Sequence, residues 1–211
     1  MISSRTAEEM LEGALLSDAH IGRILGRGKS VFSIALSGSL HRDWLVNLGL
    51  ALYSIGEVPT PGHPKTITRE DSTHKPYEYC YLTSRSSYQL AEWRSRWYPN
   101  GTKAVPAELV MTPVTLANWF MGDGSSGINA GTTIRAFLHT EAFSSEDLTL
   151  LEAGLASLGI DNVSRGKHED KVILSILAGS IDKFMEVVSP YVVQSYKYKI
   201  IRRDTKEIEN G

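Results

Sequence analysis

Two copies of one short motif constrain this chain more than any other feature of its sequence. The first copy, residues 11–19, has the sequence LEGALLSDA, and the second, residues 116–124, has the sequence LANWFMGDG. Each is an apolar segment with small residues that ends in an aspartate followed by alanine or glycine, so Asp18 and Asp123 occupy equivalent positions. The repeat predicts a chain of two similar halves, each organised around its own copy.

A helix start signal precedes each copy. Thr6 followed by Glu9 fits a capping box, in which a hydroxyl and a carboxylate bind free backbone amides. Thr112 followed by Pro113 places a capping residue ahead of a proline at the first helical position. We therefore expect two helices, which begin near Ala7 and Pro113 and end just before the two aspartates.

Small residues line both expected helices. Gly13, Ala14 and Ser17 recur at three- and four-residue spacing and share one stripe of the first helix. Ala117 and Gly122 are the small residues of the second helix. Small side chains let two helix backbones approach closely, so we expect the two copies to pack against each other and to bring their terminal aspartates together.

Two aspartates at adjacent helix C-termini are unfavourable on their own. The helix dipole is negative there, which costs roughly 0.3–1 kcal/mol per charge, and neighbouring carboxylates raise each other's pKa. A divalent cation relieves both effects, and Mg²⁺ needs few protein carboxylates because water and phosphate complete its shell. The pair therefore points to metal-assisted phosphodiester hydrolysis. The segment GDGSSG at residues 122–127 also fits a flexible turn or a weak phosphate-binding loop.

Composition narrows the class of protein. The 211 residues suit one or two domains. We find neither a run of about 18 apolar residues nor the apolar segment of a signal peptide, and so expect an intracellular protein without a membrane span. The single cysteine, Cys80, excludes an internal disulfide and a multi-cysteine zinc site.

The charge balance argues against a generic nucleic-acid binder but allows a DNA-binding face. The formal net charge is −2, whereas phosphate contacts need lysine and arginine. Residues 19–42, however, contain no acid and four basic residues, which are Arg23, Arg27, Lys29 and Arg42. A protein with one basic face can bind DNA at a net charge near zero, in a salt-sensitive manner.

Hydrophobic periodicity predicts the same order of elements in both halves. In the first half we expect a glycine-rich loop at 21–29, strands at 30–37 and 76–84, helices at 41–55 and 87–97, and either an extended hairpin or a surface loop at 59–74. After a linker at 99–111, the second half has a glycine-rich loop at 122–132, strands at 134–140, 160–165 and 171–177, helices at 145–158 and 180–188, and a mostly solvated basic tail at 196–203.

These elements predict an α+β fold. It consists of two pseudo-twofold related αββαββα-type halves, residues 1–104 and 105–211, that form a saddle of antiparallel sheets with the motif helices at the interface. In the strand at 30–37, Phe32, Ile34 and Leu36 share the face that packs, and the opposite face stays free for a ligand. Tyr77, Tyr79 and Tyr81 share one strand face. Two interpretations remain for them, half-buried packing and contacts with bases or sugars.

The paired motif resembles the signature of the LAGLIDADG homing endonucleases, in the single-chain, two-motif form found in organellar and archaeal introns. The second copy, with Thr-Pro ahead and WFMGDG at its end, is the more specific, while the first has Ala19 where glycine is usual. The resemblance covers nearly the whole chain. It implies that Asp18 and Asp123, with the backbone carbonyls of Ser17 and Gly122 nearby, hold divalent metals at the two scissile phosphates.

The same resemblance implies a basic residue near each cut. The stretch KAVP puts Lys103 in that place for the first half, and the strand start KVILSI puts Lys171 there for the second. Such a lysine holds the attacking water or stabilises the charge that develops on the phosphate. A purely solubilising surface role is the alternative for both.

Base contacts are expected on free strand faces and hairpin loops, since a β-ribbon fits the DNA major groove. Arginine contacts guanine with two hydrogen bonds, and some basic candidates will instead contact phosphate, which positions the protein without specifying sequence. The candidates are Arg23, Arg27, Lys29, Ser33, Arg69, Arg85, Arg135, His139, Arg165 and Lys167.

Together these features predict a monomeric, site-specific, Mg²⁺-dependent DNA endonuclease that makes a staggered double-strand cut in a long, asymmetric target during intron homing. Mn²⁺ is expected to substitute for Mg²⁺, and Ca²⁺ to bind without supporting cleavage. The alternative is an RNA-splicing maturase or a non-cleaving DNA-binding protein on the same scaffold. A phosphate-binding enzyme of another class would need a helix after the glycine-rich loop, whereas the residues after Gly131 favour a strand. An organelle and a prokaryotic or archaeal cytoplasm fit the sequence equally well.

Overall fold

The structure of the chain is a computed structural model that describes residues 2–57, 63–70, 75–129, 133–161, 163–168 and 171–201. The first half contains α1 (Ser4–Leu15), β1 (His20–Ile24), β2 (Lys29–Ser37), α2 (Arg42–Ser54), β3 (Lys65–Glu70), β4 (Pro76–Thr83) and α3 (Tyr88–Trp97). The second half contains α4 (Pro113–Asp123), β5 (Gly124–Asn129), β6 (Thr133–His139), α5 (Ser145–Ser157), β7 (Val163–His168), β8 (Lys171–Ile176), α6 (Ile181–Val188) and the 3-10 helix η1 (Gln194–Lys199).

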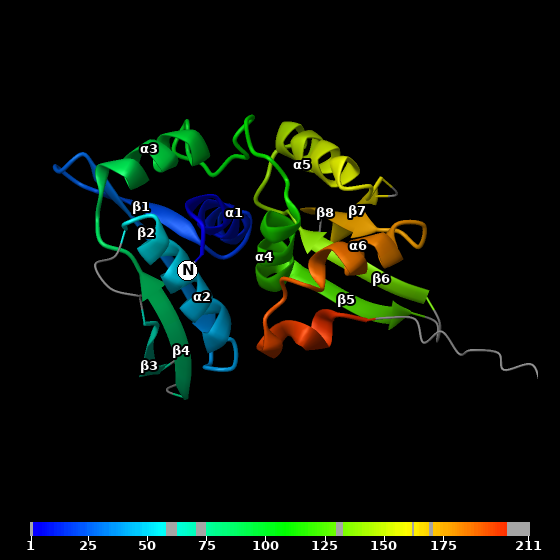
Figure 1. Ribbon diagram of the computed structural model, residues 1–211, viewed down its shortest axis with the longest axis horizontal. Helices are drawn as coiled ribbons and strands as arrows, with labels where there is room; N and C mark the ends of the chain where they lie inside the picture. The colour runs from blue at the N-terminus through cyan, green and yellow to red at the C-terminus, as the bar shows by residue number, and fades with distance from the viewer. Residues whose placement is uncertain are drawn as a thin grey trace, which may run out of the picture.

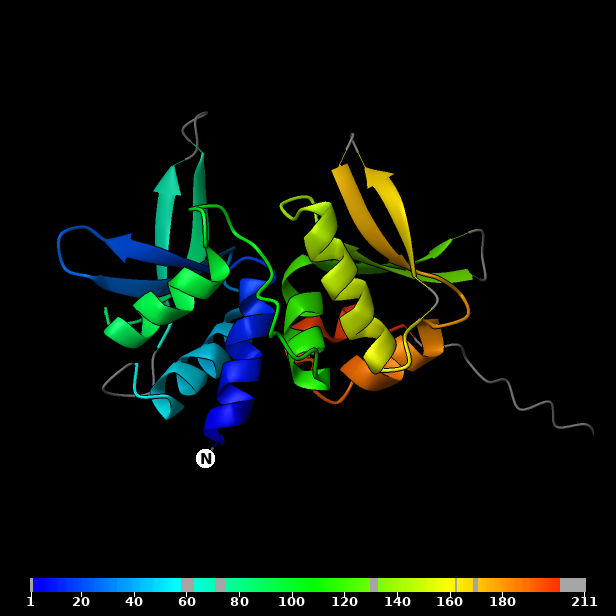
Figure 2. The ribbon, with the colours of Figure 1, turned by 90° about the horizontal axis from the view of Figure 1, so that it is seen from above.

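Each half builds one antiparallel four-stranded sheet, and the two sheets share one topology. The strand orders are β1-β2-β4-β3 and β5-β6-β8-β7. Helices α1 and α4 lie side by side at the centre of the molecule, with one sheet on either side of the pair (Figure 1). The same arrangement is visible from above (Figure 2). The predicted fold class is therefore confirmed, with the motif helices at the interface between two α+β halves.

Alternation along the strands gives each sheet a buried face and an open face. In β2, Phe32 and Ile34 are buried and Leu36 is partly buried, while Ala35 on the opposite side is exposed, as the sequence predicts. We call the face without a helical cover the open face of each sheet. On the first sheet it carries a hollow of about 470 Å³ that begins at Asp18 and runs over β2, β3 and β4.

The motif helices approach each other so closely that two positions accept only glycine. A Cβ atom added to Gly13 would overlap the backbone carbonyl oxygen of Thr115 and lie 2.6 Å from the Cβ of Asn118. A Cβ atom on Gly122 would overlap the side chain of Ser17. The small-residue stripe predicted from the sequence is thus the surface on which α1 and α4 meet.

Polar side chains also connect the two halves. The indole of Trp44 in α2 donates a 2.8 Å hydrogen bond to Oδ1 of the buried Asn118 in α4. The C-terminal segment returns to the start of α2, where Asp43 accepts hydrogen bonds of 3.0 and 2.5 Å from the backbone N–H and the hydroxyl of Ser195. The ring of His41 stacks on Tyr196 with a centroid distance of 3.9 Å. These contacts fix the second half against the first.

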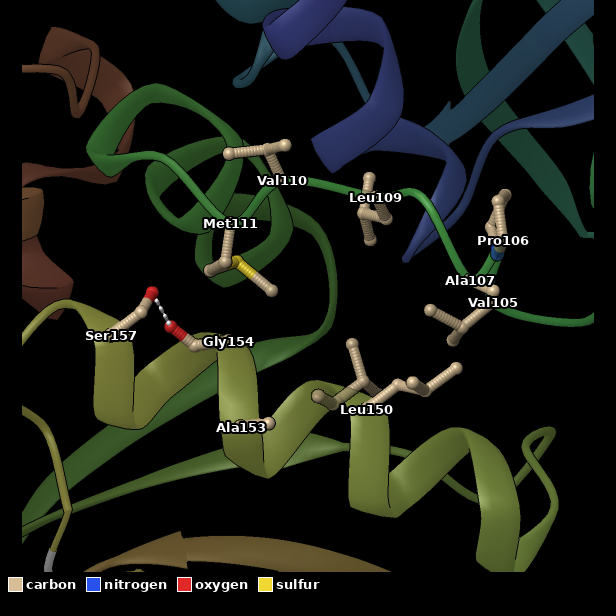
Figure 3. Close-up of a pocket in the computed structure, with 11 residues that line it drawn as sticks. Val105, Pro106, Ala107, Leu109, Val110, Met111, Leu150, Ala153, Gly154 and Ser157 are labelled. Carbon is tan, nitrogen blue, oxygen red and sulfur yellow. Dashed lines mark hydrogen bonds between the residues drawn. The ribbon is translucent and has the colours of Figure 1, made fainter.

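The linker between the halves runs along α5 and leaves an apolar cavity of about 310 Å³ beside it (Figure 3). Its lining includes Leu109 and Met111 from the linker and Leu150 from α5, and none of the described residues that line it is charged. The cavity is therefore separate from the paired acids. We retain a domain boundary between residues 104 and 105 as a proposal, since it falls within this linker.

Three local predictions were wrong. The first helix begins at Ser4 with Ser3 as its cap, because the Ser3 hydroxyl accepts a hydrogen bond from the Thr6 backbone amide; the proposed capping box at Thr6 does not form. The expected loops at 21–29 and 122–132 contain the edge strands β1 and β5, which accommodate Gly22, Gly124 and Gly127. By contrast, Thr112 caps α4 as predicted, accepting a 3.1 Å hydrogen bond from the Thr115 amide.

We expect Gly13→Ala to lower the free energy of unfolding by about 1–3 kcal/mol, because the added methyl group meets a backbone carbonyl that cannot move aside. Urea unfolding followed by circular dichroism measures the change. Gly127→Ala is the matched control: nothing lies within 4 Å of its added Cβ, so it should stay within roughly 0.5 kcal/mol of the original chain. Equal effects of the two substitutions would contradict this account of the helix contact.

Candidate active site

The two motif aspartates meet where α1 and α4 end. Asp18 follows the C-cap of α1 at Leu16, and Asp123 is the last residue of α4. A Cβ atom on Gly122 would lie only 3.2 Å from Oδ2 of Asp18. The carboxylate of one motif therefore lies beside the residue that precedes the carboxylate of the other, as the repeat predicts.

The electrostatics of this pair favour a cation. Burial raises the pKa of Asp123 to about 6, with a further contribution from the charge of Asp18, and Lys103 acts in the opposite direction. Burial also raises the pKa of Asp18, against the charges of Lys103 and Lys199. Each carboxylate therefore loses hydration and gains a like-charged neighbour on folding. Two oxygen ligands of this kind, on a face open to solvent, fit a hard divalent cation that completes its shell with water and phosphate.

Lys103 lies at the end of α1 beside both acids. Its Nζ donates hydrogen bonds of 2.8 and 2.9 Å to the carbonyl oxygens of Ser17 and Ala19. Burial lowers the pKa of Lys103 to about 8, although Asp123 and Asp18 both favour its charged form. A cation at a helix C-terminus compensates the free carbonyls and the negative end of the dipole. These contacts place Lys103 beside the end of α1 and within the electrostatic influence of both acids, and its role in a reaction stays a prediction.

Lys199 has the corresponding position at the end of α4, and sequence reasoning missed it. Its Nζ donates to the carbonyl oxygens of Phe120 (3.2 Å), Met121 (2.7 Å) and Gly124 (2.6 Å). The side chain is buried beneath the ring of Tyr196, at 4.9 Å from the ring centroid. Burial lowers its pKa to about 8 as well. The expectation of a solvated tail was therefore wrong for Lys199. The signal in the sequence was the repeat itself, since both lysines lie after the last α-helix of their half.

The two lysines differ in their remaining hydrogen-bonding capacity. A lysine ammonium has three donors. Lys199 directs all three at backbone carbonyls, while Lys103 directs two of its donors at carbonyl oxygens and is only partly buried. Lys103 therefore keeps one donor for a group placed beside the acids, whereas Lys199 holds the end of α4 in position.

A histidine and a serine accompany each aspartate on the open faces. On the Asp123 side, His139 contacts the hydroxyl of Ser125 at 3.4 Å and Oε1 of Glu141 at 3.0 Å. His139 and Glu141 border a cavity of about 210 Å³ that Asp123 and Lys103 also line. On the Asp18 side, Nε2 of His20 lies 3.1 Å from the hydroxyl of Ser33. Burial, and then the charges of Lys103 and Arg94, lower the pKa of His20.

Part of the predicted DNA-contacting set lies on the open faces. Ser33 and Arg69 border the hollow of the first sheet, and the guanidinium of Arg69 lies 4.9 Å from the ring centroid of Tyr79. Tyr77, Tyr79 and Tyr81 form a ladder on the same face, with successive ring centroids 6.2 and 5.8 Å apart. On the second sheet, Arg135 is exposed and alternates with the buried Ile134 and Ala136, as does His139 with Leu138.

Other candidates lie elsewhere. Arg165 was expected on a free strand face, but it pairs in register with the buried Leu174, and its guanidinium bonds Glu152 of α5 at 2.8 and 2.9 Å. Arg85 donates to the carbonyl of Gly56 away from the sheet, and Arg27 lies at the tip of the β1–β2 hairpin.

The remaining candidates divide into two pairs. Arg23 and Lys29 line a pocket beside α3. In the β7–β8 hairpin the backbone of Lys167 pairs with Val172 and that of Lys171 with His168. The side chains of both lysines lie outside the described part of the chain, so the role of Lys171 stays a prediction.

Two further observations limit the kinds of site present. Among the described residues, no group of three or more histidine, cysteine, aspartate or glutamate side chains is arranged to hold a metal ion. A closed, fully protein-liganded metal centre is therefore not part of the described structure, whereas the two-carboxylate site needs only two such groups. Within the same residues, no helix combines the length and hydropathy of a membrane crossing.

Comparison with known proteins places the chain in a family. The model of the LAGLIDADG DNA endonuclease family matches residues 8–184. An uncharacterized protein, MJ1098 of Methanocaldococcus jannaschii, is 31% identical over 122 residues, which make up 57% of this chain and 48% of that protein. The cytochrome b mRNA maturase bI2 of Debaryomyces hansenii is 27% identical over 199 residues, 91% of this chain and 72% of the maturase. The chain thus spans about half the length of the first of these relatives.

The fold has a close counterpart among solved structures. The homing endonuclease I-WcaI, in a structure with its DNA recognition sequence, superposes with a TM-score of 0.81 over 96% of this chain and 89% of that one, at 20% sequence identity. At this identity the likeness establishes the fold alone, which includes both sheets and the central helix pair.

The pKa of Asp123 leads to a testable pH dependence of stability. Well below pH 4 the carboxyl is protonated in both the folded and the unfolded chain. Between about pH 4 and pH 6 the unfolded chain ionises this carboxyl while the folded chain keeps the proton, so a cost in stability develops over this window and stays constant above it. We therefore expect Asp123→Asn to stabilise the metal-free protein at pH 7–8 and to have little effect at pH 4. Thermal unfolding across this range, with and without Mg²⁺, measures it; a difference that is constant with pH would contradict the proposed electrostatics.

Proposed function

The chain belongs to the LAGLIDADG DNA endonuclease family, and from this premise we propose that it is a site-specific homing endonuclease. The proposed reaction is metal-dependent hydrolysis of one phosphodiester bond in each strand of a long, asymmetric DNA target, which leaves staggered ends. We further propose that a single chain acts as a monomer, since it contains both motif helices and both sheets.

One observation carries the proposal. The acids of both motifs meet at the adjacent ends of α1 and α4, between two open sheet faces, with a lysine at the end of each helix. Two acids at the centre of a pseudo-twofold molecule are suited to two phosphates of one duplex. The sheets on either side offer surfaces for the flanking bases.

Asp18 and Asp123 are the residues that would hold Mg²⁺, with the backbone carbonyls of Ser17 and Gly122 as further oxygen ligands. When bound, the cation supplies Lewis-acid polarisation of the phosphodiester and compensates its negative charge. Mn²⁺ is the natural substitute for it, and Ca²⁺ a binding-only ion. At neutral pH the carboxylates are ionised in the presence of a cation, because the cation favours the charged form that burial alone disfavours.

Lys103 supplies positive charge where the phosphate would lie. Its pKa of about 8 keeps Nζ mostly protonated at neutral pH, and the two carbonyl contacts orient it. Its remaining donor suits a phosphate oxygen or an attacking water, where charge builds up as the bond breaks. Lys171 remains a second proposed basic residue for the other half, and Lys199 is a positioning residue for Asp123.

The open faces supply the proposed DNA contacts. Arg69, Arg135 and the Tyr77–Tyr79–Tyr81 ladder suit base edges, and Arg27 at the β1–β2 hairpin tip suits a flanking base or phosphate. Arg85 and Arg165 are retained as proposed phosphate contacts only, since both are directed away from the open faces. A net charge of −2 means that binding depends on these local basic residues, so it should weaken steeply as salt rises.

A second candidate function is intron RNA splicing as a maturase. It is favoured by one observation, the alignment of 91% of this chain with a cytochrome b mRNA maturase. Retention of both acids and both lysine caps favours the nuclease, because a pure RNA-binding role does not require two carboxylates at a shared helix end.

We expect Asp18→Asn and Asp123→Asn each to abolish double-strand cleavage while leaving DNA affinity in Ca²⁺ within about threefold, because each substitution removes a cation ligand and preserves the shape of the site. The target is first selected by cleavage of a randomised duplex library in Mg²⁺. Cleavage of that duplex and its binding in Ca²⁺ are then measured for both variants.

Asp161→Asn, on an exposed residue whose carboxylate accepts a hydrogen bond from Ser180, is the control and should cleave normally. Full activity of either motif variant would refute the assignment. Selective retention of a motif in the bound fraction without any cut product would favour the non-cleaving binder or the maturase.

We expect Lys103→Met to slow cleavage by roughly 10²–10³-fold, because it removes a donor aimed at developing charge, and to destabilise the fold less than Lys199→Met, because two rather than three carbonyls lose their partner. Lys199→Met should instead destabilise the fold by at least about 1–3 kcal/mol, since three buried carbonyls lose their partner. Single-turnover cleavage and urea unfolding measure the two effects. Lys197→Met, at an exposed lysine of η1 that bonds the Ser189 carbonyl, is the control; the same profile for Lys103 and Lys199 would contradict their division of roles.

A further inference from the structure

A basic pocket of about 430 Å³ lies at the outer edge of β1, apart from the paired acids and from the hollow of the open face. It is formed by the base of the β1–β2 hairpin, by α3 and by the turn that follows α3. Arg23, Lys29 and Arg94 contribute its cationic groups, and Tyr98 and Ser95 are among the other lining residues. None of the described residues that line it is acidic.

Arg94 is held in place by the edge of the sheet. Because β1 is an edge strand, the backbone groups of Ile21 that point outward need partners from outside the sheet. The Arg94 guanidinium donates to the Ile21 carbonyl, and the Tyr98 hydroxyl accepts from the Ile21 amide at 3.4 Å. The guanidinium also lies 4.6 Å from the centroid of the Tyr98 ring. Arg94 is thus pre-oriented, with further N–H donors beyond the one used.

The hairpin side of the pocket is fixed as well. Ser30 and Ser87 exchange two backbone hydrogen bonds of 3.0 Å, which tie the start of β2 to the start of α3. The ammonium of Lys29 lies 5.0 Å from the ring centroid of Tyr88 in the first turn of α3. The cations therefore border a pocket whose two sides, the β1–β2 hairpin and α3, are held together by hydrogen bonds.

Several basic side chains elsewhere on the surface are paired with acids, although Arg69 and Arg135, like the cations of this pocket, have no ion-pair partner among the described residues. Arg5, Arg96, Arg165 and Lys183 all form ion pairs with glutamates. Among the described residues, neither Arg23, Lys29 nor Arg94 has an ion-pair partner. Three converging cations without an acid, in a chain of net charge −2, are suited to an anionic ligand.

We propose that this pocket binds a backbone phosphate of the target duplex, just beyond the edge of the first sheet. The inference rests on the proposed function, because a duplex on the open face would run its sugar–phosphate strands past the sheet edges. The contact would position the duplex without recognising a base, so Arg23 and Lys29 act as phosphate ligands together with Arg94. The helix that corresponds to α3 in the second half, α6, contains Asp182, Lys183 and Glu186 as its charged residues and no arginine, so the contact is confined to one half.

The test compares the double variant Arg23→Gln/Lys29→Gln with the charge-matched control Arg5→Gln/Lys183→Gln. Binding of the selected duplex is measured in Ca²⁺ from low to physiological salt, and the cut site is mapped in Mg²⁺. We expect the pocket variant to lose about tenfold in affinity and to reduce the slope of log K against log salt by about 1–2, with the cut sequence unchanged. The control should match the original chain.

A second measurement needs no DNA. Inorganic phosphate is titrated into the protein while the guanidinium Nε–Hε signals of Arg23 and Arg94 are followed by NMR, and both signals should shift together. This result would stand even if the chain failed to cleave or bind any duplex. Such a failure would refute the proposed function and not the phosphate site. An unchanged salt slope, a changed cut sequence, or NMR signals that do not respond to phosphate would each overturn the pocket assignment.

Discussion

The close contact between α1 and α4 is the constraint on which the rest of the structure depends. Gly13 and Gly122 allow the two backbones to meet without intervening side chains, and this contact brings the ends of both helices to one point. Each sheet continues directly from a motif helix, so the same contact sets the relative position of the sheets. One packing interaction thereby fixes the distance between two acids and the separation of two recognition surfaces.

That contact concentrates negative charge, and the structure compensates it with buried lysines. Two carboxylates and the free carbonyls of two helix ends lie together, in a position where a dipole and like charges both oppose ionisation. Lys103 and Lys199 each bind one set of carbonyls, and burial lowers the pKa of both to about 8. The site thus retains unfavourable electrostatic interactions that a divalent cation relieves, which is a common trade of stability for function.

The sequence was sufficient to predict the parts of the site that are determined by local chemistry. The motif repeat predicted the helix pair and the meeting of Asp18 with Asp123, and Thr112 marked the start of α4. Lys199 could not be found this way, because its role arises when a distant segment folds back on α4, and its neighbours in sequence look like a solvated tail. The prediction for Arg165 was wrong for a related reason. The sequence indicates a strand, but which face of that strand is covered by α5 depends on tertiary packing.

The pseudo-twofold scaffold carries two halves that differ in chemistry. Lys103 keeps a donor beside the acids, while the donors of Lys199 are all used by α4. The Asp18 side has a histidine–serine pair, whereas the Asp123 side adds Glu141. A basic pocket flanks the first sheet, and α6 lacks the arginine to build its counterpart. Fusion of both halves in one chain permits such divergence, because neither half must match a symmetric partner; a duplex bound here would meet a different environment at each of its two strands.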